Sequence, residues 1–173
     1  LSNQSGMASA TAHVLDTLLA HNVKVTCIMS PEHGFRGDAD AGEHVSSSTD
    51  PKTGIPIRSL YEGKSGKPAK EVMDEFDVLV FDLQDVGVRS YTYISTLGLV
   101  MEACGEKGIE VMVLDRPNPL GGNKIEGCYV EPGFHSFVSQ YRIPYVYGLT
   151  PGEVALLING EGLNRGQKGD QQP

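Results

Sequence analysis

The segment Ser30 to Gly37, SPEHGFRG, places an acid, an imidazole and a guanidinium side by side, directly after an apolar run. Pro31 fixes its own backbone angle and biases the residue before it toward extended geometry, so Glu32 stands just past a predicted strand. A carboxyl group that is partly desolvated at a sheet edge has a raised pKa and can act as a general acid or base. We therefore predict Glu32 as a catalytic acid/base, with His33 tuning it or holding a substrate hydroxyl.

The same segment has a structural interpretation. In it, Glu32 forms an ion pair with Arg36 and only fastens the loop. Gly34 and Gly37 permit positive backbone angles or the close approach of a ligand, which suits either interpretation. The residue types favour the catalytic interpretation without excluding the structural one.

A second polar segment, DLQDVGVRSYTY from Asp82 to Tyr93, follows another apolar run. Asp82 ends the predicted strand, and an Asp at such a position commonly caps the next turn. Gln84 and Asp85 lie further out and are better candidates for hydrogen bonds to a ligand. Asp82 and Asp85 together with Gln84 could also hold Mg²⁺ or Ca²⁺ through oxygen ligands, although nothing else in the sequence defines such a site.

Aromatic and basic residues complete the candidate set. Tyr91 and Tyr93 can form an aromatic wall or donate phenolic hydrogen bonds, and packing with a solvated hydroxyl is an equal alternative. Arg89 and Arg116 are suited to grip a carboxylate through paired hydrogen bonds. Arg116 comes from the rigid loop DRPNPLGG, which also carries Asn118. In the structural alternative, Asp115 and Arg116 only staple neighbouring loops together.

These polar loops follow short apolar segments that read as strands of an α/β fold with a mainly parallel sheet. We predict strands at 23–29, 77–82 and 110–115, and a weaker one at 55–60 that Pro56 pushes toward a sheet edge. In open α/β sheets, ligands bind beyond the carboxyl ends of the strands, where the loops named above would meet. The opening loop SNQSG belongs to the same edge and adds Asn3 as a candidate ligand residue.

Helical periodicity separates the predicted strands. Apolar stripes predict one helix within 7–21 and another from Ile94 to Cys104, ended by Gly105 and Gly108. Thr150, Pro151 and Glu153 form the pattern of a capping box that opens a third helix, which gives Glu153 a structural role. Residues 41–54 read as a long surface loop, and the other histidines, His13 included, as surface or loop residues.

Composition narrows the classes of function. The 173 residues suit one domain, and 14 basic against 22 acidic residues give a formal charge of -8. That balance argues against nucleic acid or an anionic membrane surface as a partner. No apolar run approaches the roughly 20 residues that span a bilayer. The glycine patterns of dinucleotide and P-loop sites are missing, so we expect no organic cofactor. We also expect no metal, because the histidines lack the spacing of metal ligands and nothing else defines a site around Asp82 and Asp85.

The three cysteines, Cys27, Cys104 and Cys128, lie far apart and lack the spacing of a zinc site. They read as small buried apolar residues. An odd number excludes a fully paired disulfide framework, and cysteine usage leaves the compartment open.

Several segments, in order from Leu1 to about Asn159, closely resemble one family. They are LSNQSG, SPEHGFRGDADAGE, TGIPIRSLY, DVLVFDLQDVGVRSYTYISTL, VMVLDRPNPLGG, IEG and YGLTPGEVA. Their pattern resembles that of the exo-β-N-acetylmuramidases, the NamZ-like family. The resemblance implies a bacterial glycoside hydrolase that releases N-acetylmuramic acid from the non-reducing end of peptidoglycan fragments in cell-wall turnover, with an extracytoplasmic location.

The resemblance also implies an architecture. Residues 1–160 are expected to form a Rossmann-like, three-layer catalytic domain whose first strand is missing, and 161–173 a linker or frayed tail. Family members are longer and have a C-terminal domain that completes the cleft, which we expect to be absent here. Glu32 matches the family's proposed catalytic glutamate, and the other candidates fall at positions around the cleft: His33, Arg36, Asp85, Arg89, Tyr91, Arg116 and Asn118.

Glycoside hydrolysis commonly uses two carboxyl groups, one of which protonates the leaving oxygen. We expect Glu32 as the acid/base and Asp85 as the second carboxyl, unless the second group lies outside this sequence or is the substrate's acetamido group. The lactyl carboxylate of the sugar would give Arg36, Arg89 or Arg116 an anion to bind. Two other functions stay open: a non-catalytic domain that binds peptidoglycan fragments, and a metal-dependent hydrolase. The oligomeric state is not predicted.

Overall fold

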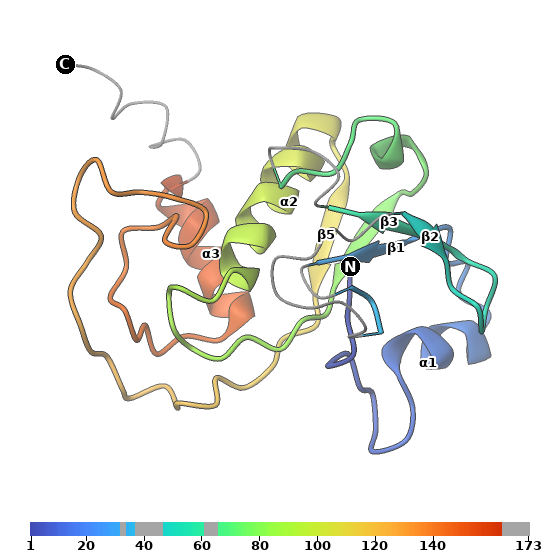
Figure 1. Cartoon of the computed structure of the whole chain (residues 1–173), viewed down its shortest axis with the longest axis horizontal. Coiled ribbons are helices and arrows are strands. Elements are labelled where there is room, and N and C mark those ends of the chain that lie inside the picture. The colour runs from blue at the N-terminus through green and yellow to red at the C-terminus, as the bar shows by residue number, and fades with distance from the viewer. Residues whose placement is uncertain (32–33, 37–46, 61–65, 164–173) are drawn as a thin grey trace. The chain divides into compact units, whose positions relative to one another are not determined.

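The computed structural model describes residues 1–31, 34–36, 47–60 and 66–163 (Figure 1). The chain forms two compact units. The first consists of Leu1–Leu83 and Ala103–Met112, and the second of Gln84–Glu102 and the chain from Val113 onward. Each unit is treated by itself below.

The strands form two small sheets. In the first sheet, β3 (Pro56–Ser59) lies between β1 (Ile28–Ser30) and β2 (Ser48–Thr49). β1 runs parallel to β3, and β2 runs antiparallel to it. In the second sheet, β4 (Val78–Phe81) pairs with β5 (Glu110–Val113). The structure is mixed α/β, as predicted, but the first sheet combines a parallel and an antiparallel pair, so it is not the mainly parallel sheet that the sequence predicted.

Three of the four predicted strands are present within a residue or two of their expected bounds, and two details are wrong. The expected strand 23–29 is reduced to β1, which begins at Ile28 opposite Ile57. The preceding partner is Pro56, which has no N–H to donate, so the ladder stops there. β3 is the central strand of its sheet and not an edge strand. Pro56 is tolerated in it because the proline occupies the first position of the strand, where a missing N–H donor does little harm.

Helix α1 (Val14–Ala20) is half as long as the predicted 7–21. It begins late because the side chain of His13 accepts a hydrogen bond from the Leu15 N–H and so acts as its N-cap. His13 therefore ends a loop, as one of the two predicted alternatives has it, but it is a buried capping residue and not a surface residue. Residues 7–13 form a loop that a bridge between Met7 and His13 closes.

The other two helices agree better with the sequence. α2 (Tyr93–Lys107) continues through Gly105 and ends before Gly108, whose φ is 71°. α3 (Pro151–Gly160) begins with the predicted capping box. A short 3-10 helix, η1 (Val72–Asp74), precedes β4. None of the described helices is long and apolar enough to cross a membrane.

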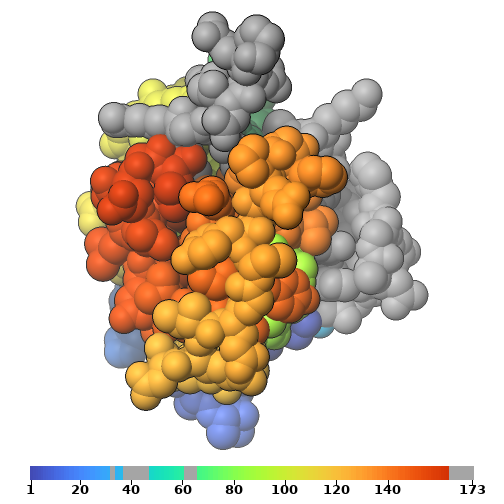
Figure 2. All heavy atoms as spheres, turned by 90° about the vertical axis from the view of Figure 1, so that its left-hand side faces the viewer, coloured from blue at the N-terminus to red at the C-terminus, as the bar shows by residue number. Residues whose placement is uncertain are grey.

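Each unit has its own apolar cluster. In the first unit, Leu15, Phe35 and two strand residues, Ile28 and Ile57, pack together. The larger cluster of the second unit joins α2 and α3 to the segment between β5 and α3. Its buried members are Ile94, Tyr141, Ile143, Tyr147, Val154 and Ile158. Figure 2 shows that the chain from β5 to α3, drawn in orange to red, forms a continuous surface.

The cysteines match their prediction only in part. Cys104 is buried, Cys27 is half-buried and Cys128 is exposed, and all three are free thiols. Burial raises the pKa of Cys104 to about 11, so this thiol stays protonated near neutral pH.

Candidate functional site

Buried polar groups of the first unit gather where β1 and β4 end. Ser30 closes β1, and Asp82 follows β4 directly; both side chains are almost fully buried. Ser2 pairs in parallel with Asp82, and its N–H donates to the Met29 carbonyl at 3.2 Å. Asn3, next in the chain, is 1% exposed. The expectation that the SNQSG loop reaches the strand ends agrees with this geometry.

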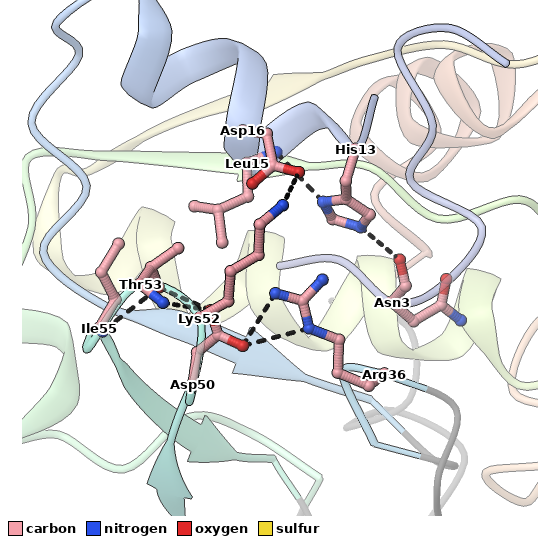
Figure 3. A network of polar contacts seen from close by, with 9 residues as sticks. All are labelled: Asn3, His13, Leu15, Asp16, Arg36, Asp50, Lys52, Thr53 and Ile55. Atoms are coloured by element: carbon pink, nitrogen blue, oxygen red, sulfur yellow. Dashed lines mark hydrogen bonds and ion pairs between the residues drawn. The ribbon is translucent and has the colours of Figure 1, made fainter. Parts of the chain in front are cut away.

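His13 ties the opening loop to α1 (Figure 3). Its Nδ1 accepts from the Leu15 N–H at 3.1 Å, so the ring proton is on Nε2, which donates to the Asn3 carbonyl at 2.8 Å. Gly6 lies against the same ring, and a Cβ at Gly6 would lie 3.1 Å from Nε2 and 3.0 Å from Asp82 Oδ2. No sequence pattern indicated this role, because histidine is rarer as an N-cap than Ser, Thr, Asp or Asn.

The Asn3 side chain holds its own loop. Its Oδ1 accepts from the Ser5 N–H at 2.9 Å and from Ser5 Oγ at 2.6 Å. This arrangement is an Asx turn, which stabilises a tight bend after a strand. The fold places Asn3 at the edge where the strands end, as predicted. Ligand binding by its side chain stays a prediction.

Arg36 is held by a buried aspartate. Its Nε and Nη2 donate to Asp50 Oδ1 at 3.1 and 2.8 Å, and its guanidinium lies 4.7 Å from the centre of the Phe35 ring (Figure 3). Asp50 Oδ2 accepts from Thr53 N–H and Oγ1. Burial alone would raise the pKa of Asp50, but the hydrogen bonds from Thr53 and Arg36 outweigh it and lower that pKa.

Asp50 was missed because its segment was interpreted as a long surface loop. It is fully buried instead, between β2 and β3. The pattern Asp-Pro-Lys-Thr, which favours a turn closed by the aspartate side chain, is the local signal that could have revealed it. Glu32 and His33 lie outside the described residues, so both their predicted roles and the alternative pair of Glu32 with Arg36 stay predictions.

The second unit contains the other predicted carboxyl group. Asp85 is 3% exposed, and its Oδ1 accepts from the Gly87 N–H at 2.7 Å and from the Tyr147 hydroxyl. Its buried Oδ2 has no hydrogen-bond partner within the described part of the chain. Burial raises the pKa of Asp85, and the bonds from Tyr147 and Gly87 oppose the rise only partly. This carboxyl group is therefore easier to protonate than an ordinary aspartate.

Tyr147 was not among the predicted site residues. Burial and the nearby Asp85 raise the pKa of its hydroxyl, so it stays a phenol and donates its proton to the carboxylate. The two residues are 62 positions apart. One sequence without an alignment offers no signal for such a long-range pair.

Gln84 and Asn118 join two loops of the second unit. Gln84 Nε2 donates to the Asp85 and Pro117 carbonyls at 2.8 and 3.0 Å. Asn118 Nδ2 donates to the Leu149 carbonyl at 3.0 Å, and its Oδ1 accepts from the Leu120 N–H at 2.9 Å. Gly87 packs against it so closely that a Cβ there would lie 2.2 Å from Asn118 Oδ1. The two loops are therefore in contact, as predicted.

The side chain of Arg89 contacts the segment between β5 and α3. It is 7% exposed, and its Nη1 donates to the Cys128 carbonyl at 2.7 Å and to the Ile143 carbonyl at 2.5 Å, while Nε reaches Ser139 Oγ at 3.3 Å. These bonds anchor the segment between β5 and α3. Substrate binding by Arg89 stays a prediction, but the donors that would grip a carboxylate are used on backbone carbonyls.

The remaining candidates lie at the start of α2 and after β5. The rings of Tyr91 and Tyr93 meet edge to face at 4.7 Å, and Tyr93 is buried while Tyr91 is half-buried. Arg116 is half-buried, and its backbone N–H donates to Asp115 Oδ1 at 3.1 Å.

Asp115 itself caps α3. Its carboxylate accepts from Thr150 Oγ1 and from the Gly152 N–H, both at 2.7 Å. Asp115 thus fastens its loop to the start of α3, which agrees with the structural alternative for this residue. An acid suits that place because the N-terminus of a helix carries partial positive charge.

Metal ligands do not cluster in the part of the chain that the structure describes: no three His, Cys, Asp or Glu side chains come together there. Asp82 and Asp85, the pair considered for Mg²⁺ or Ca²⁺, belong to different units.

Known proteins match nearly the whole chain. A curated relative from Bacillus subtilis (strain 168), named peptidoglycan beta-N-acetylmuramidase NamZ, is 50% identical over 162 residues, which are 93% of this chain and 39% of the relative. Two crystal structures of DUF1343 family proteins from Bacteroides fragilis NCTC 9343 are also similar. The first has 50% identity and a TM-score of 0.85, and the second 42% and 0.81.

The match to those structures covers 94% of this chain and 40% and 41% of theirs. The chain therefore spans about two fifths of the length of these relatives. The profile of the family described as "Exo-beta-N-acetylmuramidase NamZ, N-terminal" matches residues 1–168. On this evidence the chain belongs to the NamZ N-terminal family, as its sequence motifs predicted.

Proposed function

We propose that this chain is the part of a glycoside hydrolase that acts on peptidoglycan and releases N-acetylmuramic acid from its non-reducing end. The observation that carries the proposal is the 50% identity, over 93% of the chain, to a relative named for that activity. The polar loops at the strand ends of the first unit and the buried Asp85 of the second are consistent with such chemistry.

The proposed acid/base is Glu32. Its support is the sequence SPEHG after a strand end and the resemblance of that motif to the family pattern, because Glu32 lies outside the described residues. The strand that should display it is β1, which ends at Ser30. A carboxyl group there would protonate the glycosidic oxygen and then accept a proton from water.

Asp85 is our candidate for the second carboxyl group. Its Oδ1 is occupied by two donors, so a bound proton belongs on Oδ2. The raised pKa favours that protonated form. A carboxyl group in this state can hold or deliver a proton, and the substrate's own acetamido group is then the alternative nucleophile. This assignment rests on the surroundings of Asp85 alone.

The proposed substrate carries a lactyl carboxylate, which an arginine would bind. Among the candidates, Arg89 suits this role least, because it is buried and its Nη1 donates to two backbone carbonyls. Arg36 is exposed, but its Nε and Nη2 donate to Asp50, so we propose Arg116 first and Arg36 second. The other predicted contacts to the sugar come from six residues. They are Asn3, His33, Gln84, Tyr91, Tyr93 and Asn118.

The finer architecture and the setting are also proposals. We infer a Rossmann-like, three-layer domain over residues 1–160, followed by a linker at 161–173 and, in the whole protein, by a domain that completes the cleft. Muramyl glycans are the proposed partners, in an extracytoplasmic compartment. We propose neither a cofactor nor a metal.

The test is release of chromophore from a 4-nitrophenyl β-N-acetylmuramide by the natural full-length protein that carries this chain. We expect Glu32→Gln to lower kcat by about 10²- to 10⁴-fold, the usual contribution of general acid–base catalysis. Glu131→Gln, at an exposed position, is the matched control and should keep wild-type turnover.

Each outcome separates the candidate functions. Wild-type turnover by Glu32→Gln would show that another group is the acid/base. A wild-type protein that binds the sugar without cleaving it would favour the non-catalytic binding domain. Loss of activity with EDTA would favour the metal-dependent hydrolase.

A further inference from the structure

The chain that follows β1 is attached to the first sheet at two points. Upstream, Ser30 pairs with Ser59 in the ladder of β1 and β3, and its carbonyl accepts from the Leu60 N–H at 3.2 Å. Downstream, Phe35 is 3% exposed and packs in the apolar cluster of the first unit. Glu32, which lies outside the described residues, comes between these two points in the sequence. The chain on either side of the proposed acid/base is therefore held by the sheet.

The two attachment points lie on either side of a backbone hydrogen bond. The Gly34 N–H donates to the Pro31 carbonyl at 3.2 Å, and both residues are buried. Phe35 then packs in the cluster that contains Ile28 and Ile57, the residues that pair at the beginning of the ladder. Because Ile28 comes before the end of β1, the chain has returned toward the sheet by the time it reaches Phe35.

Arg36 extends the downstream attachment to the turn between β2 and β3 (Figure 3). Its Nε and Nη2 donate to Asp50 Oδ1 at 3.1 and 2.8 Å, and its guanidinium lies 4.7 Å from the centre of the Phe35 ring. The Asp50 side chain is fully buried, while that of Arg36 is 34% exposed. Hydrogen bonds between charged groups are strong, and a buried partner is little screened by solvent ions.

Asp50 is itself held firmly within its turn. Its N–H donates to the Ile55 carbonyl at 2.9 Å, and its carbonyl accepts from the Gly54 N–H at 2.8 Å. Its Oδ2 accepts from the Thr53 N–H at 3.1 Å and from Thr53 Oγ1 at 2.6 Å. These four bonds fix the carboxylate, so Oδ1 offers Arg36 an acceptor at a defined place beside β3.

A second ion pair of the same turn provides a contrast. Lys52 pairs with Asp16 of α1 at 2.7 Å, but the Asp16 side chain is 30% exposed and that of Lys52 61%. Exposed ion pairs contribute little, because solvent screens them and two long side chains lose freedom. Of these two pairs, the one between Arg36 and Asp50 is therefore the stronger attachment.

We propose that Asp50 is a positioning residue for catalysis: by holding Arg36, it fixes the chain just downstream of Glu32. The inference rests on the proposed glycosidase function and adds to it a residue that does not touch the substrate. A general acid must lie within hydrogen-bond reach of the atom that it protonates. A displacement of about 1 Å can lower the rate about 100-fold, so the loss of Asp50 acts on kcat.

The experiment measures kcat and KM of the natural full-length protein with 4-nitrophenyl β-N-acetylmuramide. We expect Asp50→Asn and Arg36→Met each to lower kcat about 10- to 100-fold, with KM nearly unchanged. The double variant should lose no more than the more affected single variant, because both changes remove the same contact. Asp16→Asn, which breaks the exposed pair to the same turn, is the matched control and should keep wild-type kcat.

Urea unfolding of the same variants separates positioning from stability. A contact that only stabilises the fold would lower the free energy of unfolding and leave the kcat of the folded protein unchanged. All kcat values are therefore measured without urea, well below the melting temperature of each variant. Should Asp50→Asn not fold, Arg36→Met decides alone, since it leaves the bonds between Thr53 and Asp50 in place.

Each outcome bears on the inference. It is overturned by wild-type kcat in a folded Asp50→Asn or Arg36→Met protein, by losses that add in the double variant, or by a rise in KM alone, which is the mark of lost substrate binding. An equal loss of kcat in Asp16→Asn also overturns it. A wild-type protein without turnover overturns the proposed function and this inference together, whereas an active wild type with equally active variants overturns the inference alone.

Discussion

Two buried aspartates, one in each unit, have pKa values shifted in opposite directions. Asp50 of the first unit is fully buried, and its pKa is lowered. Asp85 of the second unit is nearly as buried, and its pKa is raised. Burial raises the pKa of both, so the difference comes from their partners. Asp50 accepts from a guanidinium and from two donors of Thr53, whereas Asp85 accepts from a phenol and a backbone amide.

The second unit does contain an arginine close to its aspartate in sequence. Arg89 follows Asp85 by four residues, but its donors are used on the carbonyls of Cys128 and Ile143. The unit thereby stabilises its long segment after β5, and no cation among the described residues donates a hydrogen bond to the buried carboxyl group of Asp85. A buried carboxylate that is paired with a cation stays ionised, whereas one without such a partner is more readily protonated.

The largest effect should come from Arg89. Arg89→Met leaves one buried and one part-buried carbonyl without their charged donor, and we expect a loss of about 3–5 kcal/mol in the free energy of unfolding. Arg142→Met is the control, because Arg142 is exposed over the Tyr129 ring and should cost less than about 1 kcal/mol. Urea unfolding measures both. Equal losses would mean that Arg89 does not anchor the segment and is available to a carboxylate.

Next comes the glycine that donates to Asp85. At Gly87 a positive φ of 83° combines with the close approach of Asn118, so Gly87→Ala should cost about 2–4 kcal/mol. Gly54 of the first unit has a φ of 74° with nothing near its missing Cβ, and Gly54→Ala should cost only about 1 kcal/mol. Thermal unfolding compares them. Similar losses would show that backbone strain alone, and not the contact to Asn118, limits Gly87.

A smaller effect is expected at the phenol that contacts Asp85. Tyr147→Phe removes a donor from a buried carboxyl group and should cost about 1–3 kcal/mol, with the pKa of Asp85 rising further. Tyr145→Phe is the control, since its hydroxyl meets Ser90 Oγ at an exposed site and should cost less than about 0.5 kcal/mol. Chemical denaturation gives the energies. A lower pKa of Asp85 in Tyr147→Phe, by NMR titration, would contradict the assigned hydrogen bond.

The smallest effect is a difference in the sign of the pH dependence. The lowered pKa of Asp50 contributes stability that is present above the usual Asp pKa of about 3.9 and is lost as pH falls through its folded value. The raised pKa of Asp85 contributes stability that is present below about 3.9 and is lost as pH rises through its folded value.

Melting temperatures from about pH 3 to 7 test both signs. Asp50→Asn should flatten the loss of stability at the acid end, and Asp85→Asn should flatten the loss on raising the pH above the usual Asp range. Parallel profiles for the two variants would mean that the two aspartates do not differ as described.

Much of the fold could be predicted from short-range sequence patterns. The capping box of α3 involves residues within four positions of one another, so the sequence alone was sufficient for it. β4 and β5 were evident because both are short, apolar runs rich in valine, a residue type enriched in strands. Positions that depend on a partner were not evident. β1 is short because of Pro56, and α1 begins late because of His13, and neither reason appears in the periodicity of the segment itself.

The candidate site divides in the same way. Residue types and their places after strands were enough to nominate Asp85, Gln84 and Asn118, because parallel strands bring their carboxyl ends to one edge. Family membership, too, followed from the motifs alone. The protonation tendency of Asp85 and the structural use of Arg89 came from contacts to Tyr147, Cys128 and Ile143, distant in sequence. Desolvation and hydrogen bonding depend on which distant groups the folded chain brings into contact, and no local pattern encodes that choice.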